Sequence, residues 1–186
     1  VRGLDAHREL ELHPLLLDAL RAAGYGVTPE VRFPRERPKP RRTEGARCDM
    51  VLTPGGRPLE DPRAQADLFA PHDAVPPGDA AWLEVKVVAQ FHERGPNHAY
   101  ASALQRPVWK DVEKLAGDPE IQRAAVLLVL FTADAEIADH DLDVWSARAS
   151  LRGLSLLPRI CRTLPIGDRL GNRVCTVAIF PLAHPH

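Results

Sequence analysis

A glutamate and a lysine stand two residues apart in the middle of an apolar segment with strand character, residues 80–89. Side chains two positions apart leave the same face of a strand, so Glu84 and Lys86 project together while the apolar residues beside them face the other way. Charged groups in a core strand are costly unless they pair or bind a metal ion. The pair is therefore a candidate site, although an Asp/Glu-x-Lys triplet also arises by chance.

Two further carboxylates are expected to point into the core. Helical spacing over residues 5–23 gives an apolar stripe, and steps of 100° per residue place Glu9 near its centre. Alternation in the segment 47–53 places Asp49 on one face together with Arg47. Each acid also has a simpler explanation, because a first helical turn favours acids at Glu9, and Arg47 is an ion-pair partner for Asp49.

Together, Glu9, Asp49, Glu84 and Lys86 predict a site for a hard divalent cation. Mg²⁺ prefers oxygen ligands and keeps several waters, which suits three carboxylates. No cluster of thiolates or histidines indicates zinc, and His13, which borders the stripe of the first helix, is expected simply to pack there. A lysine beside a metal can hold the attacking water, favour its hydroxide form and offset charge on a phosphoryl group.

A mixed sheet flanked by helices is expected to position these residues. The sequence predicts eight elements in the following order: a helix over 5–23, strands over 25–33, 47–53 and 80–89, a helix over 98–116, a strand over 124–131, a helix ending near 151 and a strand over 173–180. The first three strands form a meander and the second helix crosses over to the fourth strand, which gives an α-β-β-β-α-β core.

The chain is expected to form one domain over residues 1–186. A segment rich in proline, glycine and acids at 54–79 is interpreted as a loop insertion or flap, with a short helix near 63–69. Residues 132–186 are interpreted as a peripheral C-terminal extension.

Basic and acidic residues are unevenly distributed, although their totals are 24 and 25. Residues 32–47 hold seven basic residues against two acids, and residues 132–143 hold five acids and no lysine or arginine. Such segregation suits a protein that presents one face to a polyanion, although a solvated charged loop has the same composition. The predicted contacts to nucleic acid are, in the proline-rich loop, Arg35, Arg37, Lys39, Arg41 and Arg42 and, in the second helix, Gln105 and Lys110.

The cysteines and the apolar segments of the sequence indicate the cellular compartment. Three cysteines without Cys-x-x-Cys spacing indicate neither a disulfide framework nor a zinc ribbon. No apolar segment approaches the ~20 residues that cross a bilayer, and the first residues do not resemble a signal peptide. We therefore expect a soluble, cytoplasmic protein without a membrane partner.

The order of the candidate residues resembles the PD-(D/E)xK nuclease superfamily, which includes restriction endonucleases. The resemblance covers residues 5–131 and rests on Glu9, on Asp49 in Arg-Cys-Asp-Met-Val-Leu, and on Glu84 and Lys86 in Leu-Glu-Val-Lys-Val. It implies a restriction-endonuclease-like fold and metal-dependent cleavage of phosphodiester bonds, usually leaving a 5′-phosphate, with DNA as the expected substrate.

The resemblance also implies a role for each residue. Asp49 and Glu84 would ligate Mg²⁺, for which Mn²⁺ can substitute, and the backbone carbonyl of Val85 would be a further ligand. Lys86 would position and activate the water. Glu9 would reach the metal through water or hold a second ion.

The chain departs from the family pattern in two places. Cys48 stands where proline is usual, and the long stretch between Asp49 and Glu84 leaves access of the substrate open. Two alternatives remain: a catalytically inactive member that binds DNA or a protein partner, and a structural domain in which Glu9 or Asp49 is bridged to arginine. The resemblance allows a homodimer, whereas no motif indicates sequence preference or a choice between DNA and RNA.

Overall fold

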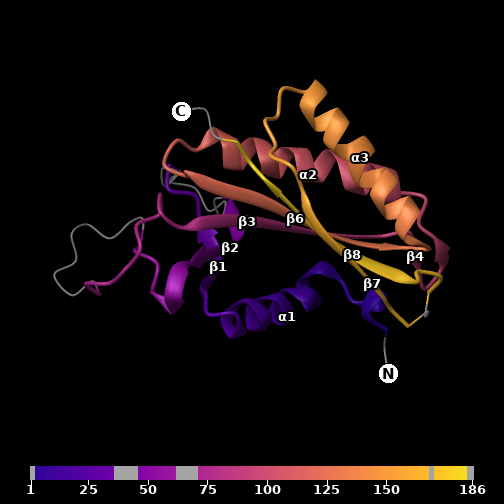
Figure 1. Ribbon diagram of the computed structural model, residues 1–186, viewed down its shortest axis with the longest axis horizontal. Helices are drawn as coiled ribbons and strands as arrows, with labels where there is room; N and C mark the ends of the chain where they lie inside the picture. Colours follow the sequence, from indigo (N-terminus) through magenta and orange to yellow (C-terminus); the bar gives the residue numbers. More distant parts are fainter. Residues whose placement is uncertain (1–2, 36–45, 62–70, 168–169, 184–186) are drawn as a thin grey trace, which may run out of the picture.

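Six strands form one mixed sheet in the order β1-β2-β3-β6-β8-β7, with helices on both of its faces (Figure 1). The computed structural model describes residues 3–35, 46–61, 71–167 and 170–183. The first three strands, β1 (Gly26–Arg32), β2 (Arg47–Thr53) and β3 (Ala81–Ala89), form the expected antiparallel meander. The next long strand, β6 (Arg123–Thr132), lies parallel to β3. The predicted mixed sheet flanked by helices is confirmed.

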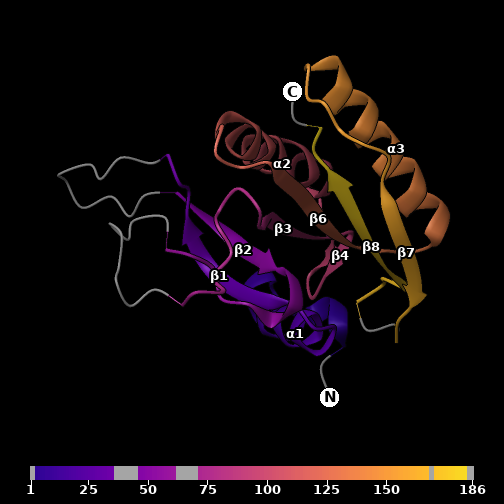
Figure 2. The same cartoon turned by 60° about the vertical axis from the view of Figure 1, so that its left-hand side comes forward.

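The C-terminal part of the chain extends the same sheet. β8 (Val174–Pro181) pairs antiparallel with β6, and β7 (Ile160–Pro165) pairs antiparallel with β8, so β1 and β7 form opposite edges (Figure 2). Residues 132–186 therefore contribute an interior strand rather than only a peripheral addition. β7 is not predicted from the sequence, because most of its residues are exposed and no apolar alternation marks it.

Three helices form the layers above and below the sheet. α1 (Glu9–Ala22) covers one face, and α2 (Tyr100–Gly117) and α3 (Ala135–Leu151) cover the other (Figure 1). Each face has its own apolar core, because the buried strands alternate their side chains between the two. The α1 core includes Leu12, Met50, Leu83, Val85 and Val129, and the α2 core includes Trp82, Val108, Val112, Val126 and Leu128.

Local sequence explains where two of these helices begin or end. Asp134 caps α3, because its side chain accepts a hydrogen bond from the backbone N–H of Ile137 at 2.8 Å. α1 is followed by Gly24 at a φ of +89°, a left-handed conformation that glycine adopts without steric cost. α1 begins at Glu9 and not at Asp5, since residues 4–6 form a separate 3-10 turn.

The segment between β2 and β3 is held at its two ends. The backbone N–H of Val75 donates to the carbonyl of Pro58 at 2.8 Å, and Leu59 forms an isolated bridge with Val75. The helix expected near 63–69 lies outside the described residues. The segment leaves β2 after Thr53 and enters β3 at Ala81, which is the end where these two strands are paired.

The remaining elements are short. A 3-10 turn follows β2 at Pro54–Gly56, and a hairpin of β4 (Phe91–His92) and β5 (Gly95–Pro96) follows β3. None of the helices in the described part of the chain is both long and apolar enough to cross a membrane.

Candidate functional site

Pairing between β2 and β3 is limited to three residues of each strand. Residues 50–52 of β2 lie opposite residues 81–83 of β3, and the register stops there. We call the region beyond, which starts at Asp49 on β2 and at Glu84 on β3, the fork. Within the fork, β3 remains paired with β6 on its other side, and two of its backbone N–H groups on the β2 side donate to carboxylates.

Two carboxylates accept hydrogen bonds from the backbone of β3 in the fork. The N–H of Val85 donates to Oδ2 of Asp49 at 2.8 Å, and the N–H of Val87 donates to Oε2 of Glu9 at 3.1 Å. Backbone donors in a protein interior need such partners, and carboxylates are strong acceptors. The fork thus fixes one acid from β2 and one from α1 against the same strand.

The ammonium of Lys86 lies among several oxygens in the fork. Its Nζ is 3.4 Å from Oε1 of Glu9, 3.9 Å from Oδ2 of Asp49 and 3.4 Å from Oδ2 of Asp111. It also donates to the carbonyl of Val85 at 3.0 Å. Burial lowers the pKa of Lys86, but the charges of these three acids outweigh burial and raise the pKa above its ordinary value, so Lys86 is a cation.

Glu84 is the most buried acid of the fork, with only 2% of its surface exposed. Its Oε1 has no hydrogen-bond partner among the described residues. Burial, followed by the charges of Asp49 and Asp111 and a hydrogen bond with Asp49, raises the pKa of Glu84 to about 9. The carboxyl is therefore protonated at neutral pH, which relieves its repulsion with the neighbouring acids.

The donor set of the fork fits a hard divalent cation. It consists of oxygens, from the carboxyl groups of Glu9, Asp49 and Glu84 and from the carbonyl of Val85, and such cations are ligated by oxygen. The unpartnered Oε1 of Glu84 is a further sign of fit, because a buried polar atom without a partner is rare in a folded protein. A cation would take several of the oxygens that Lys86 now contacts.

Sequence reasoning missed one acid of the fork. Asp111 of α2 is buried, and it accepts a hydrogen bond from Lys114 at 2.7 Å in addition to its ion pair with Lys86. A signal for it exists in the sequence: Asp111 follows Val108 by three residues and precedes Leu115 by four, which is the spacing of the buried helix face. Lys114 is itself exposed and contacts this acid from the solvent side.

The four candidate residues meet in space as expected. Glu84 and Lys86 lie on the α2 side of β3, and the neighbouring Leu83 and Val85 belong to the α1 core, which confirms the predicted alternation. Glu9 and Asp49 are both bridged to Lys86. Their roles as metal ligands or catalytic groups stay predictions.

The described contacts do not include the predicted bridge from Glu9 or Asp49 to an arginine. Arg47 points elsewhere, since its Nη1 donates to the backbone carbonyl of Glu30 at 3.3 Å. The cation beside both acids is Lys86. If the protein is a structural domain without catalytic activity, the partner of Glu9 and Asp49 is therefore Lys86 of the fork and not an arginine.

Cys48 precedes Asp49 and packs at the base of the fork. It is fully buried, and its Sγ donates to the carbonyl of Leu83 at 3.4 Å. Burial, with the charge of Glu84 second, raises the pKa of the thiol well above its ordinary value, so the sulfur is a neutral packing group.

The predicted nucleic-acid contacts fall in two places. Arg35 is exposed, and its backbone N–H donates to Oδ2 of Asp118 at 3.0 Å. On α2, Gln105 is half-buried and Lys110 is exposed, and neither belongs to the described contacts of the fork. The described residues do not include the other four predicted contacts in this loop, which are Arg37, Lys39, Arg41 and Arg42.

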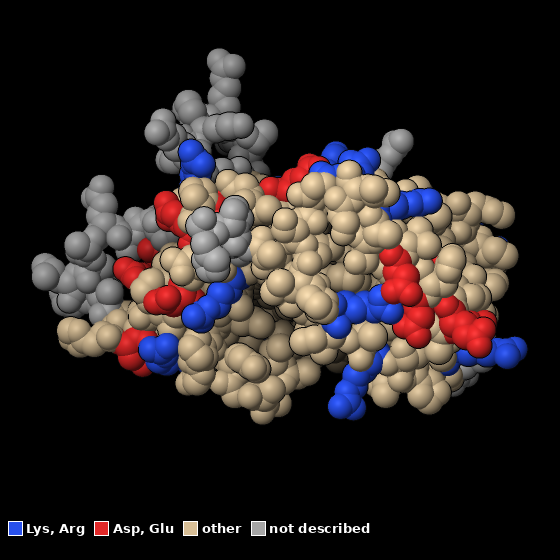
Figure 3. All heavy atoms as spheres, turned by 45° about the horizontal axis from the view of Figure 1, so that its top comes forward, with Lys and Arg blue, Asp and Glu red and all other residues tan. Residues whose placement is uncertain are grey.

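Charge segregation along the sequence is partly cancelled in space. Arg159 forms ion pairs with Asp139 and Asp143 of the acidic segment, which lie on α3. The face covered by α2 and α3 carries basic and acidic groups side by side (Figure 3). In the described part of this face, no continuous basic surface is visible.

A cavity of about 790 Å³ adjoins the fork. Glu9 and Val87 are part of its lining, so it reaches the edge of the carboxylate cluster. Arg8 and Arg94 also line it, the second from the hairpin after β3. The volume falls in the range of roughly 300–1,000 Å³ that is usual for ligand sites.

The comparisons with known proteins add no relationship to this geometry. The chain matches no protein-family model, no curated protein and no solved structure.

Proposed function

We propose that this protein is a metal-dependent nuclease with a restriction-endonuclease-like fold, which hydrolyses phosphodiester bonds in DNA. One observation carries the proposal: Glu9 of α1, Asp49 of β2 and the pair Glu84 and Lys86 of β3, which come from three separate segments of the sequence, converge in the fork between β2 and β3. Three carboxyl groups and a lysine around a backbone carbonyl suit a Mg²⁺ or Mn²⁺ site beside a nucleophilic water.

Each residue of the fork has a defined task in this reaction. A bound Mg²⁺ supplies Lewis-acid polarisation of the phosphoryl oxygen and lowers the pKa of water. Asp49, Glu84 and the carbonyl of Val85 would hold the ion, with Glu9 reaching it through water. Lys86 stays positively charged among the acids, so its ammonium can orient the attacking water and offset negative charge on the phosphoryl group.

The surroundings of the fork suit a strand of nucleic acid. The loop between β1 and β2 ends where β2 begins at Arg47, two residues before Asp49 of the fork. The cavity at Glu9 and Val87 adds Arg8 and Arg94 as further partners for phosphate groups. Phosphate contacts of this kind position a substrate without reading its sequence.

The test is a cleavage assay with Lys86→Met and Arg159→Met. Supercoiled plasmid, single-stranded DNA and RNA are incubated with each protein in the presence of Mg²⁺ or Mn²⁺. We expect the wild type to cleave DNA and Lys86→Met to lose about 10²–10³-fold in rate, the usual effect of removing one group that stabilises transition-state charge. Arg159→Met, which removes a cation far from the fork, should retain the wild-type rate.

The assay also separates the alternatives. A wild-type protein that cleaves none of the three substrates, or a Lys86→Met protein that cleaves as fast as the wild type, would contradict the proposal. Calorimetric titration with Mg²⁺ then distinguishes an inactive binding module, which need not bind the ion, from an enzyme that acts on another substrate.

A further inference from the structure

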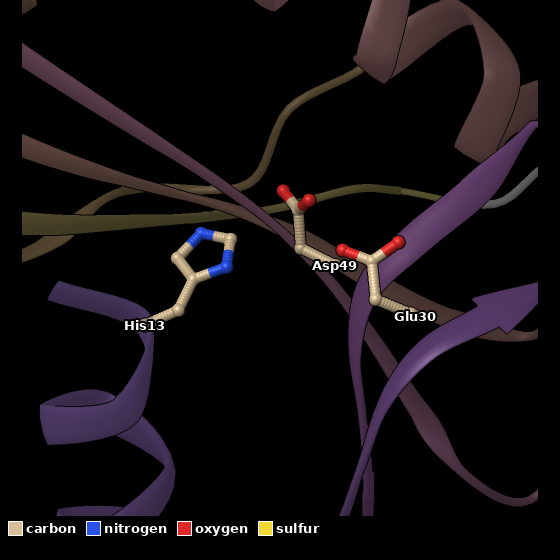
Figure 4. A group of neighbouring side chains, drawn as sticks. All are labelled: His13, Glu30 and Asp49. Atoms are coloured by element: carbon tan, nitrogen blue, oxygen red, sulfur yellow. The ribbon is translucent and has the colours of Figure 1, made fainter. Parts of the chain in front are cut away.

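A second group of metal-binding side chains lies on the outer side of Asp49. It consists of His13 from α1, Glu30 from β1 and Asp49 from β2, and one ligand atom from each lies within 4.8 Å of the others (Figure 4). Asp49 is the one residue that this group shares with the fork. The imidazole of His13 faces the two carboxylates (Figure 4).

His13 is the member that points to a ligand. The residue is half-buried, but its Nε2 atom is buried and has no hydrogen-bond partner among the described residues. Nearly all buried side-chain nitrogens in proteins have such a partner, so the unpaired Nε2 of this imidazole needs an explanation. Packing on the apolar stripe of α1, the sequence-based expectation for His13, leaves this nitrogen unexplained.

The strand pairing brings Glu30 to Asp49. The register between β1 and β2 pairs Pro29 with Met50 and Val31 with Cys48, so Glu30 lies opposite Asp49. Two carboxylates in this relation repel each other. A cation between them would replace that repulsion by attraction, and the exposed side chain of Glu30 gives it access from solvent.

We propose that His13, Glu30 and Asp49 bind a divalent transition-metal ion of the Zn²⁺ type. One imidazole nitrogen and two carboxylate oxygens are common ligands of Zn²⁺ and leave a coordination position for water. An imidazole ligand favours such an ion over Mg²⁺, for which oxygen is preferred. This centre shares Asp49 with the proposed Mg²⁺ centre but differs from it in the other two ligands, and its binding does not require the proposed hydrolysis.

The test is calorimetric titration of the full chain with ZnCl₂, for the wild type and for His13→Gln, Glu30→Gln and His140→Gln. We expect the wild type to bind one Zn²⁺ tightly, His13→Gln to lose about 100-fold in affinity and Glu30→Gln about 10-fold. His140 is exposed on α3, so His140→Gln should bind as the wild type does. A tenfold excess of Mg²⁺ should not displace the ion.

Nitrogen-15 NMR of the histidine side chains identifies the ligand directly. Addition of Zn²⁺ should shift one imidazole signal that is missing from His13→Gln. Equal Zn²⁺ affinity of the wild type, His13→Gln and Glu30→Gln, or no binding to the wild type, would overturn the proposal. Glu30→Gln keeps the test valid if His13→Gln fails to fold, because the Glu30 side chain is exposed.

Failure of the two proposals is distinguishable. Lys86→Met should slow cleavage by about 10²–10³-fold and leave Zn²⁺ affinity unchanged, because Lys86 is not a ligand of the outer centre. Glu30→Gln should weaken Zn²⁺ binding and retain Mg²⁺ binding in the fork. A protein without nuclease activity that still binds Zn²⁺ through His13 would refute the proposed function alone.

Discussion

Two clusters in this protein place a cation beside several acids, and they differ in the burial of the acids. The side chains of Lys86 in the fork and Arg159 against α3 are similarly exposed, at 19% and 23%. The acids beside Lys86 are exposed by 16% for Asp49 and 9% for Asp111, whereas Asp139 and Asp143 beside Arg159 are exposed by 56% and 69%. Water solvates the second set of acids and not the first.

Burial of the acids changes both the stability and the protonation of a charged cluster. Exposed acids keep their hydration, so Arg159 adds little stability to them. The acids of the fork have lost most of theirs, and one of them, Glu84, takes up a proton in response. Such an arrangement is costly for stability, and perturbed groups of this kind concentrate at functional sites.

The largest expected contrast is in the free energy of unfolding. Lys86→Met leaves buried carboxylates without their cation and should lower the unfolding free energy by about 3–5 kcal/mol in the absence of divalent ions. Arg159→Met should lower it by less than about 1 kcal/mol, because its acids remain solvated. Urea unfolding of both variants measures the difference, and equal losses would mean that the two clusters are energetically alike.

Glu84 should make stability depend on pH. Between pH 4.5 and about 9 the folded state holds a proton on Glu84 that the unfolded state has released, so this residue's contribution to stability falls as pH rises across that window. The slope approaches about 1.4 kcal/mol per pH unit for one proton. Glu84→Gln is neutral in both states and should lack this decline.

Urea unfolding of the wild type and Glu84→Gln at several pH values between 6 and 8.5 isolates the effect of this residue. The difference between the two proteins removes the contributions of other titrating groups, such as the histidines. Parallel stability curves would show that Glu84 is already ionised in the folded protein.

The smallest expected effect concerns salt. Exposed pairs are screened at high ionic strength, where the Debye length is about 3 Å at 1 M. The small destabilisation of Arg159→Met should therefore disappear in 1 M NaCl, whereas that of Lys86→Met should largely persist. If 1 M NaCl also removed the destabilisation caused by Lys86→Met, the charges of the fork would have to be exposed to solvent.

Much of the fold follows from local pattern in the sequence. The segment 47–53 is predicted with the bounds that β2 has, because its strand character runs up to Pro54. Inward placement of Glu9 and Asp49 came from the helical and strand periodicities. β7 escaped prediction because an exposed edge strand carries no comparable alternation.

The rest of the site depends on tertiary structure. Neither strand's sequence indicates the residue at which the pairing of β2 and β3 ends. The contacts of Asp49 with Val85 and of Glu9 with Val87 therefore could not be predicted. The sequence predicts only that His13 packs on the apolar stripe of α1, because its neighbours Glu30 and Asp49 lie on other elements and are distant in the chain. The buried position of Asp111 could have been predicted, because its spacing on α2 matches that of the buried face of the helix.

Anomalous diffraction from wild-type and Glu84→Gln crystals soaked in MnCl₂ tests directly whether the fork binds a metal ion. The proposed metal site predicts a wild-type manganese peak in the fork, in contact with Asp49, Glu84 and the carbonyl of Val85, with Lys86 displaced from that carbonyl. The peak should be lost in Glu84→Gln. A wild-type fork without manganese, in which Lys86 still contacts Val85, Glu9 and Asp111, would contradict the proposed metal site.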